Sequence, residues 1–155
     1  MKATSCLGND MAYWLMKSEP DAYSIEQLKR DKITCWDGVR NYQARNMMRD
    51  DMRKGDGVLF YHSNCAEPGV VGIATVVREG YPDHTIYKGK GNADPDNPTW
   101  FMVDIRFKRK LKRTITLAEI KNEPALAGMP LVKRGNRLSV MPVSEADWEA
   151  LLALE

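Results

Sequence analysis

The segment from Trp100 to Lys110 constrains the fold most strongly, because its residues alternate between apolar and polar types. Successive side chains of a β-strand point to opposite faces of a sheet. The alternation predicts an apolar face made of Phe101, Val103, Ile105 and Phe107. It predicts an opposite face, solvated and basic, made of Met102, Asp104, Arg106, Lys108 and Lys110. The chain must therefore build a sheet that packs one face of this strand on a core.

Other segments predict further strands and several short helices around them. Short apolar runs predict strands at residues 13–17, 33–36, 58–62, 70–77 and 138–143. Capping-box patterns begin at Ser24 and Thr116, and Asn41 and Ser144 are also typical helix caps. Residues 80–99 are rich in glycine and proline and predict a long surface loop. Helices that flank a group of strands predict an α+β fold with a small curved β-barrel or sheet.

Length and composition indicate one globular domain. The chain has 155 residues, of which 43% are hydrophobic, and no linker divides it. We expect a single domain over residues 11–155, preceded by a disordered extension of residues 1–10. Apolar stretches are too short for a membrane span and no signal peptide is visible, so we expect a cytoplasmic protein, a monomer, without membrane contact. Three separated cysteines and two histidines offer no usual metal-site spacing, and no cofactor is expected.

Positive charge is concentrated between Trp100 and Val140, although the whole chain carries only +2. This region contains three acidic residues and ten basic ones: Arg106, Lys108, Arg109, Lys110, Lys112, Arg113, Lys121, Lys133, Arg134 and Arg137. Such an asymmetry attracts polyanions. The alternative is a solvated strand edge that lysines protect from aggregation.

Sequence signatures of common enzymes are missing. There is no nucleotide-binding GxxxxGK[ST] or GxGxxG, no GxSxG and no HExxH. Cys65 lies close to His62, but three residues of spacing in a hairpin loop are weak grounds for a thiol–imidazole pair. These absences favour binding over catalysis.

Three segments place polar or aromatic side chains where sites are usually built. Lys17, Ser18 and Glu19 follow the first strand, where the alternative is an ordinary solvated turn. Residues 36–42 (WDGVRNY) hold an indole, a cation, an amide and a phenol. A flat base needs such an aromatic face and such edge-reading groups.

The second and third segments also have ordinary structural interpretations. Trp36 can be a core residue and Asn41 a helix cap. The third segment, residues 61–64 (YHSN), is a polar end on a hydrophobic strand and contains His62 and Ser63. His62 there can be a structural, hydrogen-bonded imidazole.

Together these segments resemble the EVE domain, a PUA-like family related to the YTH reader domains. The matching stretches are YWLMKSEP (13–20), WDGVRNYQARN (36–46), KGDGVLFYHSN (54–64), GVVGIATVV (69–77), WFMVDIRF (100–107) and GNRLSVMPVSEADWEALL (135–152).

The resemblance implies a curved β-barrel flanked by helices, with an aromatic pocket for a modified base, chiefly modified cytosine in DNA. By position, Trp36 would be a cage wall and Ser18, next to Lys17, would hydrogen-bond the base edge. Asn41 and Tyr42 would lie at the pocket mouth. The second tryptophan of YTH cages has no counterpart here, because Trp100 begins a strand, and Tyr81 or Tyr87 would replace it.

The sequence thus predicts a non-catalytic module that binds nucleic acid. The proposed ligand-binding residues are Lys17, Ser18, Glu19, Trp36, Asn41, Tyr42, His62 and Ser63. The proposed contacts to the nucleic-acid backbone are Arg40, Arg106, Lys108, Lys110 and Arg134. Three alternatives stay open: an RNA-binding module, an enzyme on a base or nucleoside that uses Glu19 or His62, and a protein-interaction adaptor.

Overall fold

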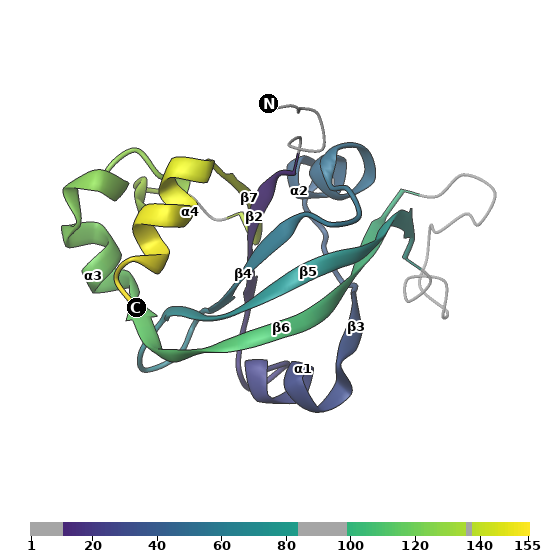
Figure 1. Ribbon diagram of the computed structural model, residues 1–155. Helices are drawn as coiled ribbons and strands as arrows, with labels where there is room; N and C mark the ends of the chain where they lie inside the picture. Colours follow the sequence, from purple (N-terminus) through teal and green to yellow (C-terminus); the bar gives the residue numbers. More distant parts are fainter. Residues whose placement is uncertain (1–10, 84–98, 136–137) are drawn as a thin grey trace, which may run out of the picture.

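A six-stranded mixed sheet forms the centre of the protein (Figure 1). The computed structural model describes residues 11–83, 99–135 and 138–155. The strands are β2 (Tyr13–Ser18), β3 (Ile33–Trp36), β4 (Gly57–His62), β5 (Gly69–Pro82), β6 (Phe101–Thr116) and β7 (Val140–Val143). Their order is β3-β6-β5-β4-β2-β7. β2 and β4 run parallel, and the other neighbours run antiparallel.

Short helices surround the sheet, so the predicted α+β class is confirmed. They are α1 (Ile25–Asp31), α2 (Tyr42–Asn46), the π-helix η2 (Met47–Asp51), α3 (Leu117–Asn122), the 3-10 turns η4 (Pro124–Leu126) and η5 (Pro130–Val132), and α4 (Glu145–Leu152). The predicted caps Ser24, Asn41, Thr116 and Ser144 all accept hydrogen bonds from backbone N–H groups of their helices. In the described strands the sheet is curved but not closed, because no pairing joins β3 to β7.

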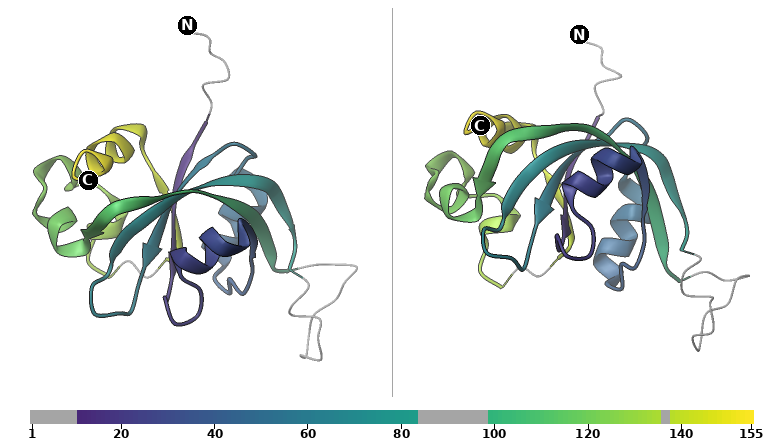
Figure 2. Two further views of the ribbon diagram at one scale, coloured as in Figure 1. Left: turned by 60° about the horizontal axis from the view of Figure 1, so that its bottom comes forward. Right: turned by 90° about the horizontal axis from the view of Figure 1, so that it is seen from below.

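Both faces of the central strands are buried, as the apolar run of residues 58–62 predicted. Val58 and Phe60 belong to a core that α1, α2 and η2 cover, whereas Leu59 and Tyr61 belong to a second core under α3 and α4. Figure 2 shows α1 and α2 beneath the arch of β5 and β6, with the C-terminal helices at the other end. No helix among the described residues has the length and apolar character that a membrane span requires.

The helix that Asn41 was predicted to cap, which contains Met47, Met48 and Met52, is not a regular α-helix throughout. After α2 the chain widens into η2, where the N–H of Met52 donates to the carbonyl of Met47 at 2.9 Å, five residues back. This extra residue in the turn brings Met48 and Met52 into the core while Met47 is only partly buried. Apolar spacing alone does not distinguish the two helix types.

The prediction of one continuous basic face on the strand of residues 100–110 is wrong. Ala74 pairs with Phe107, and the next residue, Ile73, pairs with Arg109, so Lys108 is an extra residue that forms a bulge. The bulge reverses which residues face which side. Arg106 points away from the α1 core, whereas Lys110 lies on the α1 side, 3.2 Å from Glu26. β6 is also longer than predicted, and its basic residues are divided between two faces.

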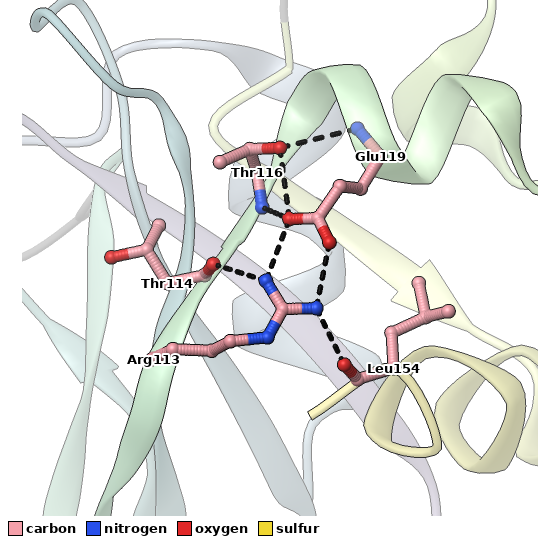
Figure 3. A network of polar contacts seen from close by, with 5 residues as sticks. All are labelled: Arg113, Thr114, Thr116, Glu119 and Leu154. Carbon is pink, nitrogen blue, oxygen red and sulfur yellow. Dashed lines mark hydrogen bonds and ion pairs between the residues drawn. The ribbon is translucent and has the colours of Figure 1, made fainter.

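Two arginines of β6, each paired with a carboxylate, hold the C-terminal end of the chain on this strand. Arg113 donates two hydrogen bonds to Glu119, at 2.9 and 2.6 Å, and a third to the carbonyl of Leu154 at 2.6 Å (Figure 3). Arg109 binds Glu155 in the same two-pronged way, at 2.9 Å for each contact, and the N–H of Lys112 donates to Glu155 at 2.7 Å. Hydrogen bonds from guanidinium groups hold the pKa values of both carboxyls at about 2, below the ordinary 4.5.

These lowered pKa values predict a loss of stability in acid. A carboxyl whose folded pKa lies below its unfolded pKa stabilises the fold above the unfolded value, about 4.5, and loses this contribution as the pH falls toward 2. We expect the free energy of unfolding in urea to decrease between pH 4.5 and 2, and less steeply in Glu155→Gln. Glu149→Gln is the matched control, because Glu149 is exposed and forms no ion pair within the described chain. An identical pH dependence in Glu155→Gln and the wild type would refute this assignment.

Candidate functional site

A cavity of about 1000 Å³ lies where β2 and β4 end. Because these strands are parallel, their carboxyl ends meet at the same edge of the sheet. The N–H of Ser63 donates to the carbonyl of Ser18 at 3.0 Å and fixes the two ends together. Lys17 and Ser18 from β2, with Ser63 and Asn64 after β4, line one side of the cavity.

The other walls come from the edges of the curved sheet and from one turn. Thr34, Cys35 and Trp36 of β3, followed by Asp37, line the cavity, although β3 is at the far end of the strand order. Ser139, just before β7, comes from the opposite edge. Glu19, Ala22 and Tyr23 belong to the turn between β2 and α1. The curvature of the sheet thus brings both of its edges to one cavity.

Trp36 is a core residue that also lines the cavity. Its side chain is only 8% exposed and meets Phe60 edge-on, with ring centroids 5.5 Å apart and an interplanar angle of 88°. It is therefore part of the core that α1 and α2 cover. It also lines the cavity, so its small exposed part is available to a ligand.

Ser18 and Lys17 are held by contacts inside the protein. The Ser18 hydroxyl donates to the carbonyl of Tyr23 at 2.6 Å, which leaves the hydroxyl oxygen able to accept from a ligand. The Lys17 ammonium lies 5.8 Å from the centroid of the Tyr61 ring. Partial burial lowers the pKa of Lys17, and burial raises the pKa of Tyr61 to about 12. As long as Ser18 keeps its hydrogen bond to the Tyr23 carbonyl, its hydroxyl can act in the cavity only as an acceptor.

Three predicted ligand residues do not line the cavity. The Asn41 side chain accepts from the N–H of Ala44 at 3.0 Å, so it caps α2. Tyr42 is 60% exposed and packs on Trp100, with ring centroids 4.9 Å apart. His62 Nε2 accepts from the N–H of Ile25 at 3.1 Å, at the start of α1, and burial lowers its pKa. His62 is accordingly a neutral imidazole that fixes α1 to β4.

The five predicted backbone contacts differ in how far other groups neutralise them. Arg40 donates to the buried carboxylate of Asp83 at 3.1 Å, and Lys110 pairs with Glu26. Arg106, Lys108 and Arg134 are exposed and form no ion pair with any described residue. These three are the predicted cations that an approaching polyanion would meet unpaired.

The sequence did not indicate four polar or aromatic residues of the cavity: Tyr23, Thr34, Cys35 and Ser139. Tyr23 is its second aromatic side chain among the described residues, and its hydroxyl donates to Asp31 at 2.9 Å. Tyr81, proposed for that role, instead donates to Asp104 and lies under Arg78, 3.5 Å from the ring centroid. Tyr87 lies outside the described residues.

The lining combines aromatic rings with polar side chains that can contact the edge of a flat ligand. Burial, followed by the charge of Asp37, raises the pKa of Cys35, so its thiol is protonated near neutral pH. No cluster of three His, Cys, Asp or Glu side chains in the described residues could hold a metal ion. The cavity offers two carboxylates, an ammonium group, an amide, hydroxyls and two aromatic rings. Such a mixture of aromatic walls and edge-reading groups is typical of sites for heterocyclic ligands.

The curved mixed sheet and its helices define a PUA-like α+β domain, and the profile of the EVE domain family matches residues 12–154. The chain belongs to this family. Thymocyte nuclear protein 1 of Homo sapiens is 45% identical over 175 residues, which cover 97% of this chain and 77% of the relative.

Solved structures are similar over almost the whole chain. A protein from Pseudomonas putida has a TM-score of 0.88 at 46% identity, with 92% of this chain and 99% of that chain covered. The human THYN1 protein, solved in complex with 5-methylcytosine containing DNA, has a TM-score of 0.85 at 42% identity, with 92% and 96% covered. These likenesses agree with the predicted family and fold.

Proposed function

We propose that this protein is a non-catalytic reader of DNA that takes a modified cytosine, with 5-methylcytosine as the reference ligand, into the cavity between β2, β3 and β4. The observation that carries this proposal is the cavity itself, which combines aromatic and edge-reading groups in a chain similar to human THYN1. That relative was solved in complex with 5-methylcytosine containing DNA.

Two parts of a cytosine, its flat face and its exocyclic amine, have a chemical counterpart in the lining. Trp36 and Tyr23 supply aromatic surface on which a base can stack, worth about 1–3 kcal/mol per base. The exocyclic amine of cytosine is a donor that carboxylates accept, and the exposed carboxylate of Glu19 lines the cavity. Stacking and such edge contacts together offset the few kcal/mol that extruding a base from a duplex costs.

Exposed basic side chains would contact the phosphates of the DNA backbone. Arg106, Lys108 and Arg134 supply positive charge that no described carboxylate neutralises. Contacts of this type add affinity that falls with salt and does not depend on the sequence. Lys110 and Arg40 would have to exchange a protein carboxylate for a phosphate, so their contribution is smaller.

A non-catalytic role is also supported by the positions of Glu19 and His62, the two acid–base groups that an enzyme would use. His62 does not line the cavity, and its Nε2 lone pair is already used by Ile25. Of these two groups only Glu19 lines the cavity, together with the carboxylate of Asp37. A nucleoside that is recovered unchanged after prolonged incubation with the protein would agree with this interpretation.

The test is fluorescence anisotropy with oligonucleotides that carry one cytosine or one 5-methylcytosine. Burial of one additional methyl group is worth about 0.8 kcal/mol, so we expect about fourfold tighter binding of the modified strand. Glu19→Ala should weaken binding of the modified strand about tenfold, because a good edge contact is worth about 1–3 kcal/mol. Asp21→Ala is the matched control, since Asp21 is exposed in the same turn and does not line the cavity.

Trp36→Phe completes the experiment, because Trp36→Ala would also remove about 3–5 kcal/mol of core packing. We expect Trp36→Phe to reduce the preference for 5-methylcytosine while the protein stays folded. Equal affinity for both DNA strands, unaffected by Glu19→Ala, would refute the reader function. Tighter binding of the matching RNA would instead favour the RNA-binding alternative.

A further inference from the structure

A four-layer stack of cations and aromatic rings lies outside the cavity, where α2 meets the start of β6. Tyr42 and Trp100 pack on each other, with ring centroids 4.9 Å apart and tilted by 32°. The Arg45 guanidinium lies over Tyr42, 5.0 Å from the ring centroid, and that of Arg40 lies over Trp100 at 5.4 Å. Figure 1 places α2 on the side of the molecule away from α3 and α4.

Within this stack, the Arg45 guanidinium is fixed by groups that do not neutralise it. Its Nε donates to the side-chain oxygen of Asn46 at 2.8 Å, and its Nη1 donates to the carbonyl of Thr99 at 2.6 Å. Its Nη2 makes no hydrogen bond to the described residues. Two neutral acceptors and an aromatic face thus hold a full positive charge in place, and Nη2 keeps its N–H groups free of any acceptor among the described residues.

Neighbouring arginines differ from Arg45 in this respect. Arg49, one turn later, donates twice to Asp50, at 2.8 and 2.9 Å, and Arg40 donates to the buried carboxylate of Asp83. Arg45 forms no ion pair with a described carboxylate; its charge contributes to lowering the pKa of Asp50, whose oxygens Arg49 already binds. The stack therefore presents one uncompensated guanidinium.

We propose that Arg45, held on Tyr42, binds a backbone phosphate of the DNA strand whose base enters the cavity. A guanidinium that is stacked on an aromatic ring and keeps free N–H donors is well suited to phosphate. This inference rests on the proposed function, and it assigns to Tyr42 a role outside the cavity: it orients Arg45 and does not touch the base.

The position of Arg45 along the chain is compatible with this contact. Asp37 lines the cavity, and four residues followed by one turn of α2 lead from it to Arg45; the separation would be greatest if those four residues were fully extended. The two Cα atoms are therefore at most about 20 Å apart. A DNA strand carries one phosphate per roughly 3.4 Å of helix axis, so the contacted phosphate lies within about six nucleotides of the bound base.

The experiment compares Arg45→Ala with wild type on 20-nucleotide strands that carry a central cytosine or 5-methylcytosine, between 50 and 200 mM salt. We expect Arg45→Ala to bind both strands more weakly by the same factor, about three- to tenfold at the lowest salt. The slope of log K against log salt should decrease in magnitude by about 0.7–0.9, the value for one lost phosphate contact. The preference for 5-methylcytosine should be unchanged.

Two further variants separate position from charge. Arg49→Ala removes a cation that Asp50 already neutralises, and we expect the wild-type slope. Tyr42→Leu keeps the Arg45 charge but removes the ring beneath it, and we expect a weaker affinity for both strands, with circular dichroism confirming the fold.

Each outcome decides between the two proposals. An unchanged slope in Arg45→Ala, or equal changes in Arg45→Ala and Arg49→Ala, would overturn the phosphate contact. If wild type binds both strands without preference and Arg45→Ala still lowers the slope, the reader function is wrong and the phosphate contact stands. No wild-type binding to either strand would overturn both.

Discussion

Replacement of Asp56 by alanine is expected to lower the free energy of unfolding by about 3 kcal/mol and the melting temperature by roughly 6–12 °C. Asp56 is 2% exposed, and its carboxylate accepts three hydrogen bonds. The donors are the N–H of Ala12 at 3.1 Å, the indole N–H of Trp14 at 2.9 Å and the N–H of Arg53 at 2.8 Å. Asp56→Ala removes the acceptor of all three.

The indole N–H accounts for much of this expected loss. Trp14 is buried, so its N–H cannot turn to water, and a buried donor without a partner costs about 1–3 kcal/mol. The N–H groups of Ala12 and Arg53 are nearer to solvent and cost less. Asp56 also joins β2 to the turn before β4, so its loss weakens the parallel pair that carries the cavity.

Urea unfolding measures this effect, with Asp51→Ala as the control. Asp51 is exposed, forms no ion pair with a described residue and lies five positions away, so its replacement should change stability by less than about 0.5 kcal/mol. A loss below about 1 kcal/mol in Asp56→Ala, with an unchanged dependence on urea concentration, would show that the buried carboxylate is not a principal stabilising group.

Local features of this fold were predictable from the sequence because their physics is local. Ser24 and Thr116 cap helices through residues three positions later, and the pattern contains both partners. Features that depend on a neighbouring strand were not predictable. The bulge at Lys108 arises from pairing between β5 and β6, so the alternation of residues 100–110 gave no sign that Arg106 and Lys110 face opposite sides.

The residues of the candidate site also divide into those that the sequence could predict and those that depend on the arrangement of the strands. Lys17, Ser18, Glu19, Trp36 and Ser63 line one cavity, and their place at strand ends was visible in the sequence. Ser139 joins them only because the sheet curves until both its edges reach the cavity, which requires knowledge of the strand order. Tyr23 joins them from the turn between β2 and α1. Asn41 and Tyr42 were predicted at the cavity mouth because they follow Trp36 closely in the sequence. This prediction is wrong, because the residues after Asp37 lead away from the cavity into α2.

Asp83 holds the turn at residues 38–40, which follows the cavity residues Trp36 and Asp37. Asp83→Ala is expected to lower both the stability of the fold and the affinity for the base. Its side chain is fully buried, and Oδ2 accepts from the N–H of Gly38 at 2.8 Å and from Arg40 at 3.1 Å. Gly38 has a φ of 79°, a left-handed conformation that this contact helps to hold. The N–H of Asp83 in turn donates to the carbonyl of Trp100 at 2.9 Å.

Without the Asp83 carboxylate, the Gly38 N–H and the Arg40 guanidinium lose a shared acceptor. We expect a loss of about 2–3 kcal/mol in stability, below the range for a fully buried pair because Arg40 is partly exposed. Folded proteins of this type are stable by about 5–15 kcal/mol, so the variant should stay folded. Because Trp36 and Asp37 directly precede the released turn, we also expect about tenfold weaker binding of 5-methylcytosine strands.

A double-mutant cycle with Arg40→Ala separates the ion pair from the turn. If the pair dominates stability, the double variant should be little less stable than Asp83→Ala. The effect on DNA binding should differ between the two single variants, because the Gly38 contact is lost only when Asp83 is replaced. Arg40→Ala should therefore keep the preference for 5-methylcytosine that Asp83→Ala reduces. Equal losses of preference in both single variants would contradict this. They would show that the Arg40 charge, and not the conformation of the turn at Gly38, shapes the cavity wall.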